Sequence, residues 1–151
     1  MGAIVRKILL ALALAVALTL PLFAVGTATV TTTQYAGLNS ANRVRYAIAW
    51  TSTAGGAVSG NAFAIVRGKL LSVKFMPNTG VTQPTDLYDA TLIDADSVDL
   101  LNGAGTDLSN ATGKYFLFSP SIYLDGTSTL DLVIANAGNA KTGIVYIWVE
   151  Q

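Results

Sequence analysis

Aspartates are concentrated in one stretch of the chain, YDATLIDADSVDLLNGAGTDLSN, which spans residues 88–110. The stretch contains no lysine or arginine that would neutralise them. Closely spaced carboxylates can bind calcium, because this ion takes about six to eight hard oxygen ligands. On this interpretation the candidate metal ligands are Asp94, Asp96 and Asp99.

Two other interpretations compete with a metal site. Paired carboxylates that hydrolyse glycosides need aromatic sugar platforms beside a cleft, and the nearest aromatics, Tyr88 and Tyr115, fit strand positions better. Residues 94–97, Asp-Ala-Asp-Ser, have the composition of a β-turn, in which aspartates accept hydrogen bonds from the backbone amides that follow. An EF-hand loop would carry glycine where Asp99 stands. A β-hairpin with polar turns is therefore the favoured interpretation.

The absence of cysteine and histidine excludes much of enzyme chemistry. Without cysteine there are no disulfides, thiol nucleophiles or Cys-ligated zinc sites. Without histidine the commonest general base is missing, and a Ser-His-Asp triad cannot form. The run GNAKT at residues 138–142 lacks the second glycine of a phosphate-binding loop, and we interpret it as a hairpin turn. We expect a protein that is not an enzyme and has no cofactor.

Charge and length set further limits. The chain has 151 residues, which is the size of one domain, and a formal net charge of zero. A neutral chain has no long-range field to attract nucleic acid, so we expect no nucleic-acid partner. Only 12% of residues are charged, about half the usual share for a soluble domain. Such a surface suits a crowded assembly, in which much of it is covered.

The N-terminus, residues 1–26, is an apolar block. Arg6 and Lys7 precede eighteen uncharged residues, 8–25. This layout fits a cleaved secretory signal peptide, a retained membrane anchor, since about 20 residues span about 30 Å of hydrocarbon, or an apolar helix buried in a protein assembly. We expect a helix that stays with the chain and precedes a separate domain of residues 27–151. The expected anchor residues are Ile8, Leu14, Leu18 and Val25.

Beyond residue 26 the pattern changes to short β-strands separated by Gly, Asn, Asp and Ser. The segment VRYAIAW at residues 44–50 alternates apolar and small or polar side chains, which is the period of a half-buried strand. The last segment, IVYIWV, is apolar on both faces and predicts a central strand or one covered by a neighbouring subunit. About eight or nine strands predict an all-β fold, an antiparallel sandwich or jelly roll. The predicted strands are 29–35, 43–50, 62–67, 69–76, 86–93, 98–101, 114–118, 129–135 and 143–149.

Two groups of side chains are candidates for contacts with a partner. The aromatic residues of VRYAIAW and IVYIWV are expected to assemble the chain into a homo-oligomer. They are Tyr46, Trp50, Tyr146 and Trp148. The second group is basic and either solvates strand edges or forms a modest basic face against a partner's acids. Its members are Arg43, Arg45, Arg67, Lys69 and Lys74.

Two runs carry a resemblance to a known class of proteins. They are DLYDATLIDADSVDLLNGAGTDLSNAT, residues 86–112, and LDLVIANAGNAKTGIVYIWV, residues 130–149. A Tyr-Asp strand leading into an Asp-rich turn, and an Asn-Ala-Gly turn before the last strand, resemble small structural proteins of tailed bacteriophages. The likeness covers about residues 60–149, rests on turn patterns, and does not include the apolar N-terminus. It implies a small β-sandwich protein of the virion, such as a capsid decoration or cement protein.

We therefore expect a structural virion protein that binds copies of itself and a major capsid or other structural protein. Membrane contact is expected only through residues 8–25. The alternative is an exported or membrane-anchored bacterial surface protein, secreted or held in the cell envelope, that binds calcium or carbohydrate.

Overall fold

The computed structural model describes residues 26–35, 42–126 and 129–151. In these ranges the chain is all-β, as predicted, and its regular structure besides strands is a single 3-10 turn, η1 (Gly80–Thr82). The strands are β1 (Thr27–Tyr35), β2 (Arg43–Thr51), β3 (Phe63–Ala64), β4 (Gly68–Pro77), β5 (Asp89–Ile93), β6 (Lys114–Leu124), β7 (Thr129–Ala135) and β8 (Thr142–Glu150).

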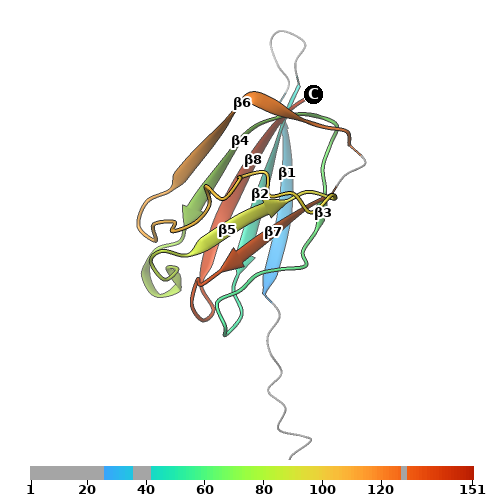
Figure 1. The fold of residues 1–151 in the computed structure, drawn as a ribbon. Helices are drawn as coiled ribbons and strands as arrows, with labels where there is room; N and C mark the ends of the chain where they lie inside the picture. The colour runs from blue at the N-terminus through green and yellow to red at the C-terminus, as the bar shows by residue number, and fades with distance from the viewer. Residues whose placement is uncertain (1–25, 36–41, 127–128) are drawn as a thin grey trace, which may run out of the picture.

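The strands form two antiparallel sheets (Figure 1). One has five strands in the order β1-β2-β8-β4-β6, and the other has three in the order β3-β7-β5. The last strand, β8, lies at the centre of the larger sheet, which confirms the prediction that IVYIWV is a central strand. Neighbouring strands pair with both of its edges, β2 on one side and β4 on the other.

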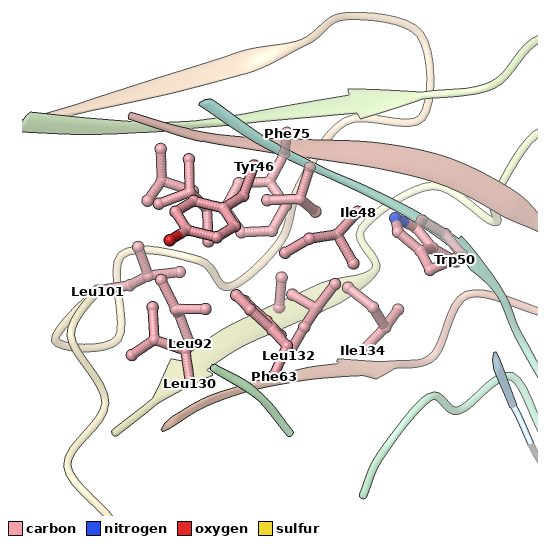
Figure 2. Packing of buried hydrophobic residues seen from close by; sticks show 14 of the residues in the cluster. Tyr46, Ile48, Trp50, Phe63, Phe75, Leu92, Leu101, Leu130, Leu132 and Ile134 are labelled. Atoms are coloured by element: carbon pink, nitrogen blue, oxygen red, sulfur yellow. The ribbon is translucent and has the colours of Figure 1, made fainter. Parts of the chain in front are cut away.

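The core lies between the two sheets and follows from strand alternation. In β2 the side chains of Val44, Tyr46, Ile48 and Trp50 are at most 2% exposed. Figure 2 shows residues of β2 pointing toward Leu132 and the other apolar residues of the smaller sheet. Side chains two apart on a strand share a face, so the period-two pattern places one whole face of β2 in this core.

The connections after β2 pass from one sheet to the other. Residues 62–67 and 69–76 were predicted to be one bent strand or a tight pair, but β3 and β4 belong to different sheets. The change of sheet ends at Gly68, where a Cβ would collide with the backbone carbonyl of Glu150. The hairpin predicted at residues 138–142 is wrong for the same reason, because β7 and β8 also lie in different sheets.

Several predicted strands differ in extent from the observed ones: β3 and β5 are shorter than the predicted 62–67 and 86–93. Residues 98–101 form only an isolated bridge between Ile93 and Asp99, and β6 continues beyond residue 118 to Leu124. The segment that links β5 to β6 runs beside β5, pairs with it again at Leu108, and buries Leu108 in the core. This segment therefore acts as a cover for the edge of the smaller sheet.

The expected N-terminal helix and its anchor residues, Ile8, Leu14, Leu18 and Val25, lie outside the described residues. Within the described ranges, no helix is both long enough and apolar enough to cross a membrane.

Candidate functional site

The carboxylates of the Asp-rich stretch bind backbone amides. Asp94 Oδ1 accepts hydrogen bonds from the backbone N–H groups of Asp96 at 3.0 Å and Val98 at 2.8 Å. These two bonds close the turn at residues 94–97, and Ser97 adopts a left-handed backbone with φ of 65°. The turn interpretation of this stretch is confirmed.

Asp99 has a similar structural role over a longer range. Its carboxylate accepts hydrogen bonds from the backbone N–H groups of Leu92 at 3.2 Å, Leu101 at 3.0 Å and Gly103 at 2.9 Å. It thereby ties β5 to the segment that covers it. In the part of the chain that the structure describes, no group of three or more acidic, His or Cys side chains is arranged to hold a metal ion.

The side of the five-stranded sheet that faces away from the smaller sheet carries a different set of side chains, which we call the outer sheet face. Its members follow from strand register, because outward residues of neighbouring strands lie opposite one another. Its larger, charged and small members are Tyr35, Arg43, Arg45, Ala47, Ala49, Lys69, Ser72, Lys74, Met76, Tyr115, Leu117, Tyr123, Ile144, Tyr146, Trp148 and Glu150, and the same register adds the threonines Thr27, Thr29, Thr31, Thr33, Thr51 and Thr142.

Large apolar and aromatic side chains are exposed on the outer sheet face. Leu117 is 73% exposed, Tyr123 58% and Tyr115 51%. Single exposed apolar residues are ordinary in soluble proteins, whereas several on one sheet face are a candidate for contact with a partner.

Arg45 lies at the centre of an aromatic cluster on this face. Its guanidinium carbon is 5.3 Å from the ring centroid of Tyr146, 5.6 Å from that of Trp148 and 5.7 Å from that of Tyr35. The Nε atom is buried without a hydrogen-bond partner. The rings hold the cation in place through cation–π contacts, but no acceptor among the described residues satisfies its N–H groups.

The charges of the outer sheet face are unbalanced. Arg43 pairs with Glu150, with Nη2 to Oε2 at 3.6 Å, and Glu150 is the acidic member of the face. Arg45, Lys69 and Lys74 form no ion pair with any described residue. Four of the five basic residues singled out in the sequence therefore share this face, while Arg67 precedes β4 and donates from Nε to the Tyr123 hydroxyl at 2.6 Å. Three of the four have no acidic partner in the described part of the chain.

A shallow hollow of about 450 Å³ opens at one end of the outer sheet face. Ala49 forms part of its floor, and Met76, Ile144 and Tyr146 form apolar walls. The hollow lies where β2 places the small Ala49 opposite Ile144 of β8. It offers a recess for an apolar side chain, and its lining contains no acidic or basic side chain.

The four aromatic residues expected to mediate assembly lie on opposite faces of the sheet. Tyr146 and Trp148 are half-buried on the outer sheet face. Tyr46 and Trp50 are only 2% exposed and pack inside the chain's own core. The assignment of Tyr46 and Trp50 as contact residues is corrected, because their strand positions point between the sheets.

Sequence reasoning did not identify the residues that β1 and β6 add to this face, Tyr35, Tyr115, Leu117 and Tyr123. The alternation in KYFLF, residues 114–118, indicated two faces for β6, but it could not say which face was solvent-exposed. Only the register of β6 on β4 places Tyr123 beside Lys69 and Tyr115 beside Lys74.

Buried tyrosines have raised pKa values without a role in chemistry. Burial raises the pKa of Tyr88 to about 12. Burial also raises the pKa of Tyr46, although the hydrogen bond that its hydroxyl accepts from Val66 N–H opposes this effect. Both side chains are in the core, so neither is available to act on a substrate.

No protein-family model matches the chain, and no curated protein or solved structure is detectably similar to it. The function therefore has to be inferred from the geometry of the described residues.

Proposed function

We propose that the protein is a non-enzymatic structural subunit of a virion. It decorates or cements a capsid by associating with copies of itself and with a major capsid or other structural protein. The outer sheet face is the surface through which it makes these contacts.

The strand order supports a jelly-roll sandwich as the framework of this subunit. In the larger sheet β2, β8, β4 and β6 are neighbours, and in the smaller sheet β3, β7 and β5 are neighbours. Alternation of the chain between two sheets in this order supports a jelly roll, an architecture common in viral capsid proteins and lectins. This is an argument from fold, so the site has to carry the functional argument.

The observation that carries the proposal is the size and character of the outer sheet face. Five strands about 4.8 Å apart, rising about 3.3 Å per residue over nine residues, give a face of roughly 24 by 30 Å, or about 700 Å². Each partner in a stable protein–protein interface contributes about 800 Å². Exposed aromatics and arginine are also the residues that dominate binding energy in such interfaces.

A double variant tests the proposal. Leu117→Glu with Ile144→Glu places two carboxylates on the outer sheet face at exposed positions, so the fold is retained. The matched control is Val81→Glu with Leu87→Glu, which alters exposed apolar residues elsewhere. The first pair should reduce both self-association, measured by sedimentation, and incorporation into particles at least ~10-fold. The control pair should reduce neither. Equal assembly of the two double variants would overturn the proposal.

A second candidate function is supported by the exposed tyrosine rings. Tyr115 and Tyr123 on β6 present flat apolar surfaces, on which sugars can stack. An exported or envelope-anchored surface protein that binds carbohydrate would use the same face. Calorimetric titration with an anionic polysaccharide distinguishes the two functions, because saturable binding that Tyr115→Ala abolishes would favour the second.

A further inference from the structure

We propose that the outer sheet face binds the Asp-rich turn, residues 94–97, of a second copy of the chain, so that subunits associate head to tail. This inference rests on the proposed function and specifies the partner of the outer sheet face. It joins two features of the molecule that lie on opposite sheets.

The first step is the unsatisfied cation. The guanidinium of Arg45 is fixed among three aromatic rings and lacks an acceptor among the described residues. Guanidinium groups pair most effectively with carboxylates, because their planar donors match two carboxylate oxygens. The chemistry of the site therefore selects a carboxylate.

The second step is the separation of charge across the molecule. Within the described ranges, the cations outside the outer sheet face donate hydrogen bonds inside the chain: Lys114 Nζ to the backbone carbonyl of Ala104 at 3.1 Å, Lys141 Nζ to that of Val81 at 3.0 Å, and Arg67 Nε to the Tyr123 hydroxyl at 2.6 Å. The smaller sheet and the segment beside β5 lie on the other side of the molecule (Figure 1), and most of the acidic residues belong to them or directly precede β5. They are Asp86, Asp89, Asp94, Asp96, Asp99, Asp107 and Asp131.

The third step is the availability of the turn. Residues 95–98 are exposed, and the carboxylate of Asp96 accepts no hydrogen bond from the described residues. Asp94 uses only Oδ1 to hold the turn, which leaves Oδ2 for a partner. By contrast, two outer sheet faces docked on each other would oppose cations to cations, and like charges across an interface disfavour such pairing.

A contact between two different surfaces is heterologous, and its rotation decides whether copies close into a ring or continue as a lattice. A closed ring uses both surfaces of every copy, whereas an open assembly leaves one surface free at each end. A head-to-tail contact suits a subunit that covers a larger surface. It also pairs the basic face of one copy with the acidic turn of the next, which balances the charges of a chain whose net charge is zero.

Engineered cysteines give a direct test in the full-length chain, because the natural chain has none. One preparation carries Ala47→Cys on the outer sheet face, and another carries Ala95→Cys in the turn. The two preparations are mixed and mildly oxidised. The disulfide between position 47 of one chain and position 95 of another should be at least ~10 times as abundant as a disulfide between two copies of either position, since a disulfide needs Cα atoms within about 7 Å. Arg45→Glu on the first chain should reduce the mixed product ~10-fold, and Asp96→Arg on the second should restore it.

The matched control places Asp96→Arg on the Ala47→Cys chain, whose own turn is not used in the mixed contact, so the yield should stay unchanged. A dominant Ala47–Ala47 disulfide would overturn the head-to-tail contact and leave the proposed function standing. The same holds if no disulfide forms but Leu117→Glu with Ile144→Glu still prevents particle incorporation, because the face then binds another protein. If the chain shows neither disulfides nor association, both proposals fail.

Discussion

At the residue scale, Asp99 has a structural role that can be measured. Its carboxylate accepts three backbone hydrogen bonds, so Asp99→Ala leaves three amides without that partner. We expect a loss of about 3 kcal/mol in the free energy of unfolding, because each of the three unmade bonds to a charged acceptor costs about 1 kcal/mol. Chemical denaturation measures this loss.

Asp96 provides the control for this experiment, because it lies in the same stretch but is exposed and accepts no hydrogen bond from the described residues. Asp96→Ala should change the free energy of unfolding by less than about 0.5 kcal/mol. Equal losses in the two variants would mean that the acidic stretch acts through its total charge instead of through the bonds of Asp99.

Tyr88 makes the stability of the protein depend on alkaline pH. Burial raises its pKa from 10.0 to about 12, so the folded chain retains a proton that the unfolded chain releases. The stabilisation of the folded chain that comes from the raised pKa of Tyr88 is therefore complete below pH 10 and is lost as the pH rises toward 12. Tyr88→Phe should flatten the fall of melting temperature over this range. Part of the slope should persist, because the pKa of Tyr46 is also raised.

At the element scale, β8 has two faces with different energetic importance. Ile147 is 0% exposed in the core, whereas Ile144 is 37% exposed on the outer sheet face. Ile147→Ala should lower the free energy of unfolding by about 2–5 kcal/mol, since it removes buried methyl groups and leaves a cavity. Ile144→Ala, the same change on the same strand, should cost less than about 1 kcal/mol.

Denaturation with urea measures both variants. Similar losses would show that the outer face of β8 is covered in the folded chain, which would contradict its role as a contact surface. A loss at Ile144 that appears only in the assembled protein would instead support that role.

The limits of sequence reasoning also appear at this scale. The alternation of VRYAIAW and the two-sided apolarity of IVYIWV are local patterns, so the place of β2 at the core and of β8 at the sheet centre could be predicted. The sheet to which each strand belongs could not, because Gly68 reads as a bulge or a turn until its contact with Glu150 is known. Strand pairing is a long-range property that short patterns do not contain.

The candidate site was less predictable than the fold. Its central cluster joins Tyr35, Arg45 and Tyr146, which are far apart in the sequence and meet only through the register of three strands. The basic residues were identifiable as a group, but their shared face was not. The hydrogen bonds of Asp94, by contrast, connect near neighbours, and turn composition alone predicted them.

At the scale of the whole molecule, the domain should fold without its apolar N-terminus. Among the described residues, the fully buried apolar side chains of the core lie between Val44 and Val149, and β1 adds only the partly buried Ala28 and Val30. Gly26 packs closely against Ala57 and is the natural first residue of a shortened chain. A chain that starts at Gly26 should melt within about 5 °C of the full-length chain, because a change of 1 kcal/mol in a domain of this size shifts the melting temperature by roughly that amount.

The apolar segment should then matter for location instead of folding. Residues 8–25 contain no charge, and burying their side chains in lipid or in a protein channel would remove well over ~1000 Å² of apolar surface from water, at about 25 cal/mol per Å². Leu14→Asp with Leu18→Asp introduces two charges that oppose this burial. The double variant should be released from particles or membranes while its melting temperature stays unchanged. Full retention of the variant, measured by flotation and particle sedimentation, would show that the outer sheet face alone holds the subunit in place.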